Sequence, residues 1–196
     1  MCGDACSLGY FGSSKNQGII IVMKRFLNRF IHRILWIFTQ MFPNRVREIV
    51  LDGRPYLRRF YITSKTDKDR AFGVYLHYFH RGDEDRELHN HPWKKSCSLI
   101  LAGGYDEERA LPSGEIVVRP IKAGRINIIK AGDFHRIILN KSYGAHTWTL
   151  FISGARVPKT PEGYKDWGFW DKATGQYVPH EQFHTVKKRE YSNLSD

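Results

Sequence analysis

The chain has 196 residues, 41% of them hydrophobic, so it is long enough for one buried core and too short for two ordinary domains. Its 31 lysines and arginines against 20 acidic residues give a formal net charge of +11, which favours anionic partners such as nucleotides, nucleic acid or an acidic membrane surface. Three cysteines, with no long apolar run and no secretory signal pattern, argue against a disulfide-rich, zinc-finger or membrane-spanning protein, and a cytoplasmic protein is expected.

The N-terminal part of the chain is expected to contain one helix. Residues 1–22 begin with many Gly, Ser and Cys residues and no usable period, so they are expected to form a flexible tail. Residues 23–43 are expected to form an amphipathic helix, because apolar side chains recur at helical spacing with basic residues between them until Pro43. Three roles stay open for this helix: packing on the domain, contact with a second subunit, and attachment to a membrane surface through residues 23–42.

Residues 44–156 are expected to form an all-β barrel. Short runs rich in β-branched and aromatic residues alternate there with turn residues, which is typical of an antiparallel sandwich or barrel. The runs are Tyr56–Thr63, Phe72–His80, Ser96–Ala102, Glu115–Arg119, Arg125–Ile129, Phe134–Leu139 and Thr147–Ser153. Residues 157–196 hold several aromatic residues among Gly and Pro, and are expected to be a C-terminal flap and tail that packs on the barrel.

Three histidines form the pattern with the clearest chemistry. His89 and His91 are separated by one residue, and side chains at i and i+2 of an extended chain point to the same face. His135 follows on a separate expected strand and can reach the same centre. Three imidazoles on one metal ion leave other coordination positions open for water, oxygen or substrate, so the pattern predicts a working metal site.

The region around the first two histidines resembles the first motif of the cupin superfamily. In that motif a His-x-His pair precedes a Glu, and a Gly stands seven residues beyond the Glu. His89, His91 and Gly103 stand at matching positions. Ser96 stands at the position of the Glu, which puts a carboxylate ligand in doubt.

The region around the third histidine resembles the second cupin motif. Gly124, Gly132 and His135 stand at the spacings of that motif, whereas Lys130 replaces its Pro. Together the two motifs cover most of residues 56–153. The chain is also similar to a group of small cupin proteins of phages and bacteria that has no settled activity, in the runs Leu88–Trp93, Asp133–Arg136 and Trp167–Trp170.

The resemblance implies a cupin-type double-stranded β-helix, which is a jelly-roll barrel, here preceded by the N-terminal helix. It further implies that His89, His91 and His135 hold Fe(II), as in cupins that resemble thiol dioxygenases, with Zn, Ni, Cu or Mn as other metals. The function expected from it is an Fe(II) oxygenase or dioxygenase, an oxidoreductase that acts on a small anionic molecule. Cupins often pair through their sheets, so a homodimer is also expected.

Two other functions stay open at this point. One is a metal-bound isomerase, lyase or hydrolase, in which the ion acts only as a Lewis acid. The other is a non-catalytic cupin that binds a ligand or nucleic acid. Lysine and arginine are scattered along the chain, so a basic solvated surface is the simpler interpretation of the charge.

Four residues are expected to contact the substrate. Arg58 and Arg136 are placed there because a guanidinium group binds a carboxylate or phosphate through two hydrogen bonds. Trp93 is expected to cap the cavity, and His146, at the start of a strand, is expected to lie beside the ligands. The sequence does not identify a general acid or base.

Overall fold

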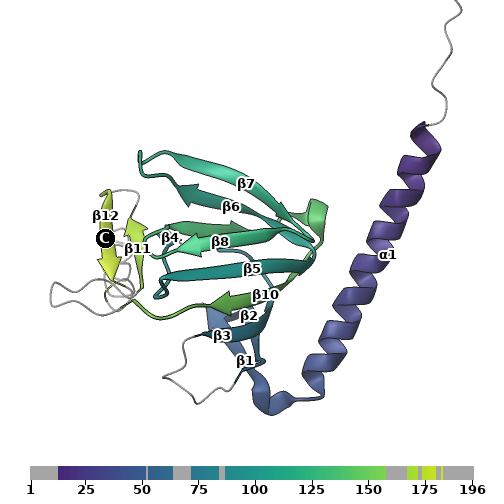
Figure 1. Cartoon of the computed structure of the whole chain (residues 1–196), viewed down its shortest axis with the longest axis horizontal. Helices are drawn as coiled ribbons and strands as arrows, with labels where there is room; N and C mark the ends of the chain where they lie inside the picture. Colours follow the sequence, from purple (N-terminus) through teal and green to yellow (C-terminus); the bar gives the residue numbers. More distant parts are fainter. Residues whose placement is uncertain are drawn as a thin grey trace, which may run out of the picture.

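The computed structural model describes residues 13–51, 53–63, 72–83, 87–157, 167–171, 174–179 and 182. In these residues two antiparallel sheets of six strands each face one another, and a long helix lies to one side (Figure 1). The first sheet has the order β1-β2-β3-β10-β5-β8 and the second β12-β11-β4-β9-β6-β7.

The elements have the following bounds. The helices are α1 (Ser13–Gln40) and the 3-10 turns η1 (Pro43–Arg45) and η2 (Lys141–Tyr143). The strands of the first sheet are β1 (Val46–Leu51), β2 (Arg54–Tyr61), β3 (Gly73–Phe79), β10 (Thr147–Ser153), β5 (Lys95–Ala102) and β8 (Ile126–Lys130). Those of the second are β12 (Gln176–Pro179), β11 (Gly168–Asp171), β4 (Leu88–His89), β9 (His135–Ile138), β6 (Gly104–Ala110) and β7 (Ile116–Lys122).

The central strands follow the pairing of a rolled-up hairpin. Strand β6 pairs with β7, β5 with β8, β4 with β9, and β3 with β10, so each pair lies one step further from the turn between β6 and β7. The successive pairs belong alternately to the second and the first sheet. This is the strand order of a jelly roll, so the chain forms a cupin-like β-sandwich. The closed barrel stays a prediction.

The interior between the sheets contains an apolar core cluster that also borders a cavity. Side chains alternate along each strand, so every second residue of a strand points inward. Strand β2 contributes Leu57 to this cluster, β3 contributes Phe79, β5 contributes Ile100, β6 contributes Tyr105 and β9 contributes Ile137. This cluster fixes the spacing of the two sheets beside the histidines of β4 and β9.

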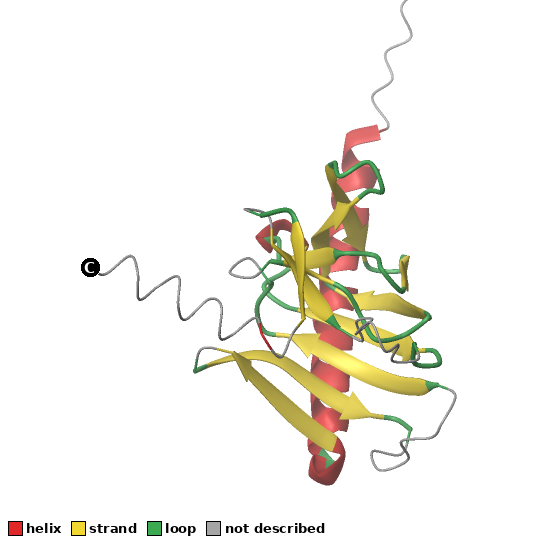
Figure 2. Ribbon diagram, turned by 90° about the vertical axis from the view of Figure 1, so that its left-hand side faces the viewer, coloured by secondary structure: helices red, strands yellow, loops and turns green. Residues whose placement is uncertain are grey.

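Helix α1 packs on the outer face of the first sheet with the C-terminal half of its length. Ile31 and Leu35 contact a buried cluster that includes Phe60 and Trp148. The Asn28 carboxamide oxygen accepts a hydrogen bond of 2.6 Å from the Gly103 amide. Figure 2 shows the helix running along one side of the strands. Packing on the domain, one of the three roles considered for this helix, therefore accounts for its C-terminal half.

The start of α1 differs from the sequence-based boundary. The helix begins at Ser13, so residues 13–22, expected in the flexible tail, are helical, while residues 1–12 lie outside the described part of the chain. The run Ile19–Val22 after Gly18 continues the apolar helical pattern, which explains the longer helix. No helix among the described residues is long and apolar enough to cross a membrane.

All seven strands expected from the sequence are present, and the described residues form five more. The additional strands are β1, β4, β6 and the pair β11 and β12. The last two form a hairpin that pairs with β4 at the edge of the second sheet. The described parts of the expected flap therefore form regular sheet next to the histidines.

Candidate metal centre

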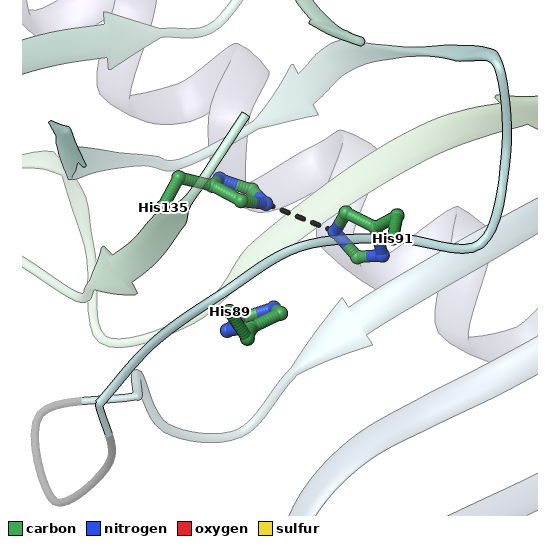
Figure 3. Close-up of side chains that lie close together, drawn as sticks. All are labelled: His89, His91 and His135. Carbon is green, nitrogen blue, oxygen red and sulfur yellow. Dashed lines mark hydrogen bonds between the residues drawn. The ribbon is translucent and has the colours of Figure 1, made fainter. Parts of the chain in front are cut away.

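The three predicted histidines lie together inside the sandwich. His89 ends β4 and His135 begins β9, and the two residues are direct partners in the pairing of these strands. His91 follows two residues after His89, and the three side chains converge (Figure 3). One ring nitrogen from each residue can be chosen so that all three atoms lie within 4.8 Å of one another. The sequence spacing thus brings three imidazoles to one place.

The distance between two of the rings fits a shared metal ion. The Nε2 atoms of His91 and His135 are 2.9 Å apart. Two imidazole ligands at a typical metal distance of about 2.1 Å and at a right angle would place their nitrogens about 3.0 Å apart. A divalent ion can therefore replace the proton that these two nitrogens share. His89 completes the three-nitrogen set on the same side.

Glu107 orients the third histidine. Its side chain is fully buried on β6, and the His135 Nδ1–H donates a hydrogen bond of 2.8 Å to the carboxylate. With the proton held on Nδ1, the lone pair of Nε2 points toward the other two histidines. Such carboxylate–histidine pairs fix the tautomer and raise the basicity of a metal-binding imidazole.

The Glu107 carboxylate is stabilised in its charged form by several donors. Arg109 and Asn127 donate hydrogen bonds of 3.0 Å and 2.7 Å to it, and Arg119 donates another. Burial raises the pKa of Glu107, but the hydrogen bonds from His135 and the two arginines outweigh this and hold the pKa well below its usual value. A negative charge thus lies behind the His135 imidazole, on the side away from His91.

His91 is neutral when the site is metal-free. Burial lowers its pKa well below the usual value, and the nearby His135, His89, Arg59 and His77 lower it further. Neutral imidazole is the form that binds a metal ion. Trp93 stacks on the His91 ring with centroids 5.5 Å apart, which restricts the ring's rotation.

The histidines line a cavity of about 470 Å³ that is large enough for a small ligand. One wall is apolar and includes Ile129 and Phe151, and Trp93 and Trp167 also line the space. Three arginines contribute to the lining, namely Arg47, Arg59 and Arg156, whereas none of the described lining residues is acidic. The cavity is therefore suited to an anion.

Arg59 is the most constrained of these arginines. Its Nε donates a hydrogen bond of 3.0 Å to Nε2 of His77, and its guanidinium carbon lies 5.3 Å from the centre of the Tyr75 ring. His77 is itself buried, and its ring stacks against that of Tyr75 and that of Phe151. Burial, and then the charge of Arg59, lower the pKa of His77 well below the usual value, so His77 stays neutral and accepts this bond.

Of the four residues expected to contact substrate, only Trp93 lines this cavity. Arg58 points to the outer face of β2, where it pairs with Glu48 and lies over the Trp36 ring at 4.8 Å. Its neighbour Arg59 points inward because adjacent residues of a strand face opposite sides. The sequence identifies a basic strand but not which of the two arginines faces the interior.

The remaining two residues also lie elsewhere. Arg136 on β9 donates a hydrogen bond of 2.7 Å to Glu108. His146 lines an open cleft between α1 and the first sheet, with its ring 5.1 Å from that of Tyr78. Arg136 is adjacent to the inward-facing His135, so it faces outward by strand alternation. His146 lies just before the start of β10.

Ser96, at the position of the motif Glu, is buried and on the same face of β5 as Ser98, which lines the cavity. A serine side chain is shorter than a glutamate by two heavy-atom positions and carries no negative charge. Among the described residues, the group that could hold an ion consists of the three histidines alone. This arrangement leaves coordination positions open on the cavity side.

No protein-family model matches the chain, and no curated protein sequence is significantly similar to it. Among solved structures, Fe(II)-HppE with (S)-1-HPP is 12% identical over 55% of this chain and 54% of the other, with a TM-score of 0.44. The Lactobacillus farciminis oxalate decarboxylase formate complex is 15% identical over 59% and 32% of the two chains, with a TM-score of 0.45. The chain thus spans about half of one relative and a third of the other. Similarity at this level leaves the activity to be inferred from the site itself.

Proposed function

We propose that the protein is a metal-dependent cupin-type enzyme, an Fe(II) oxygenase or dioxygenase that acts on a small anionic molecule. The observation that carries this proposal is the convergence of His89, His91 and His135 at the wall of a cavity. A structural metal site is normally closed by four protein ligands, whereas a catalytic site keeps positions free. Three ligands beside a ligand-sized space favour catalysis.

The residues of the site would have the following roles. The three histidines would hold the ion, and Glu107 would keep His135 in the tautomer that binds it. The ion would supply Lewis-acid activation and, as Fe(II), redox chemistry with dioxygen. Arg59 would hold the anionic group of the substrate, and Trp93 and Trp167 would exclude water from the cavity.

The absence of acidic residues from the described cavity lining supports an anionic substrate. Three arginines line the space. A divalent ion held by three imidazoles would keep its full positive charge, because none of these ligands is a carboxylate. A carboxylate or phosphonate can bridge a guanidinium group through paired hydrogen bonds.

The first test is metal binding. Protein freed of metal is titrated with Fe(II) without oxygen, and with Zn(II), by calorimetry. We expect one ion per chain for the wild type and at least a hundredfold weaker binding for His89→Ala and His135→Ala. His80→Ala is the control, because His80 does not line the cavity. Equal binding by all four proteins would contradict the site.

The second test is oxygen consumption by the Fe(II)-loaded protein with a panel of small carboxylates, phosphonates and thiols. We expect at least one anionic compound to be consumed together with dioxygen, and His135→Ala to abolish this. Turnover of a compound without oxygen uptake would instead favour an isomerase, lyase or hydrolase. Metal binding with no turnover of any compound would favour the non-catalytic alternative.

A further inference from the structure

Helix α1 exposes an apolar stripe along most of its length. The stripe consists of Ile19, Met23, Phe26, Leu27, Phe30, Ile34 and Ile37, all of them exposed. Phe26 and Phe30 are 68% and 62% exposed, although they are among the most hydrophobic side chains of the protein. Their spacing of three and four residues puts them on one side of the helix over about 27 Å.

The stripe is not the face that packs on the domain. The packed side is formed by Asn28, Ile31, Leu35 and Thr39, which are buried or half-buried. At about 100° per residue, the centre of the stripe lies about 140° around the helix from the centre of the packed side. The fold therefore buries one side of α1 and leaves a second apolar side uncovered. In Figure 1 the N-terminal half of α1 extends beyond the strands.

The charges of α1 all have one sign. Its 28 residues contain Lys15, Lys24, Arg25, Arg29 and Arg33 and no aspartate or glutamate. Exposed apolar side chains with only cationic neighbours are typical of a helix that lies in the plane of a membrane interface. The basic residues would then meet the negative surface potential of anionic lipids.

Two of these arginines also line an open cleft next to the stripe. Arg29 and Arg33 border a space of about 560 Å³ between α1 and the first sheet, together with His32, Trp36 and His146. None of the described residues that line this cleft is acidic. The cleft is therefore suited to a lipid phosphate group when the stripe is inserted among acyl chains.

We propose that α1 docks the protein on the surface of an anionic membrane. The apolar stripe would enter the boundary between head groups and acyl chains, with Arg29 and Arg33 contacting lipid phosphates. A second copy of the chain fits this surface less well, because pairing two stripes would bring two acid-free cationic helices together. The metal centre is on the second sheet, on the other side of the first sheet from α1, so docking leaves its cavity uncovered.

The test is co-sedimentation with vesicles of phosphatidylcholine alone and of phosphatidylcholine mixed with phosphatidylglycerol. We expect the wild type to bind the mixed vesicles only, and more weakly as salt is added. Phe26→Asp/Phe30→Asp should weaken binding by more than about a hundredfold, since each buried phenylalanine contributes about tenfold or more. Arg29→Glu/Arg33→Glu should weaken it by at least about 25-fold, at roughly fivefold for each cation.

Two matched variants control for charge and surface polarity. Val118→Asp/Ile126→Asp changes two side chains on the sheets that are 60% and 63% exposed, and Lys95→Glu/Lys130→Glu changes the net charge by the same amount as the arginine variant. Both controls should bind like the wild type, and unfolding temperatures identify any variant that misfolds.

Three results would overturn the proposal. These are failure of the wild type to bind mixed vesicles, equal binding to both vesicle types, and equal loss in a control. Sedimentation equilibrium tests whether a second copy of the chain occupies the stripe instead. A dimer that Phe26→Asp/Phe30→Asp disperses, with no vesicle binding, would assign the stripe to a second copy. None of these results depends on the metal site, so this proposal and the enzymatic one can fail separately.

Discussion

Glu107 determines which ring nitrogen of His135 is available to bind a metal ion. His135 alone is an imidazole that can bind through either ring nitrogen. With its Nδ1–H held by a buried carboxylate, only Nε2 is left for a ligand, and that atom faces His91. Sequence analysis did not find Glu107, because it stands in the charged run Asp106–Arg109, which is typical of a solvated segment. Only the pairing of β6 with β9 shows that it is internal.

Glu107→Gln separates orientation of the histidine from charge. The amide oxygen can still accept the His135 proton, but the negative charge behind the imidazole is lost. We expect metal affinity to fall by about 10- to 100-fold, measured by calorimetry. The free energy of unfolding should also fall by about 3 kcal/mol, because Arg109 and Arg119 lose their ion pairs with this buried carboxylate, although Arg109 keeps its pair with Asp133.

Asp106→Asn is the control for this variant. Asp106 is adjacent on the same strand, and its carboxylate contacts Asn140 and Tyr143 instead of the histidines. Metal affinity should be unchanged in Asp106→Asn. If Glu107→Gln lost stability but kept the wild-type metal affinity, the negative charge of Glu107 would not contribute to metal binding.

At the scale of elements, the strands determine which residue of a pair faces the cavity. Sequence periodicity locates a strand. Which of its alternate side chains face the interior depends on pairing partners that are distant in the chain. For this reason the sequence predicts β2 as a strand but does not show that Arg59, and not Arg58, faces the cavity. The sequence also does not predict β4, since a strand of two residues, Leu88–His89, has no period to detect.

Arg59→Gln tests the assignment of the inward face of β2. The glutamine keeps a polar side chain, two atoms shorter, but carries no positive charge and cannot form an ion pair with an anion. Binding of oxalate or a small phosphonate to the metal-loaded protein should weaken by about tenfold or more, measured by calorimetry. Arg58→Gln is the matched control and should bind these anions like the wild type. A larger effect for Arg58→Gln would show that Arg58, and not Arg59, is the side chain of β2 that faces the cavity.

Leu35→Ala tests the packed side of α1. Leu35 contacts the cluster around Phe60 and Trp148, so its removal should cost about 2 kcal/mol of the free energy of unfolding in urea. Ile34→Ala changes the neighbouring exposed side chain and should alter stability by no more than about 0.5 kcal/mol. Equal effects at the two positions would mean that α1 does not pack on the sheet through this side.

At the scale of the whole molecule, the motifs predict the convergence of the three histidines more accurately than the sequence pattern predicts the start of helix α1. His89, His91 and His135 meet because β4 and β9 pair in a jelly roll, and the motif spacings encode that pairing. The sequence does not predict the start of α1, because glycine disfavours a helix, whereas in the structure the apolar run after Gly18 continues the helix. The expected homodimer and the cytoplasmic location stay predictions.

The sandwich holds neutral histidines on both faces of the first sheet, and this gives the whole protein a pH dependence. His77 and His91 lie in the cavity, and His32 and His80 lie on the outer side. Burial is the main cause that lowers the pKa of each below the ordinary 6.5. Above pH 6.5 the folded and unfolded chains are both neutral at these positions. Below it the unfolded chain binds protons that the folded chain does not, so stability is lost as the pH falls.

Urea unfolding of the metal-free protein between about pH 8 and about pH 5 checks this sign. The free energy of unfolding should be steady at the upper end and should decrease below about pH 6.5, by at most about 1.4 kcal/mol per pH unit for each histidine. The amide oxygen of His77→Gln can still accept the hydrogen bond from Arg59. This variant should show a smaller change of unfolding free energy with pH, by the contribution of one histidine. Comparison of the two proteins at the upper pH isolates any loss of packing. A stability that stays flat or rises on acidification would mean that these imidazoles are not kept neutral by the fold.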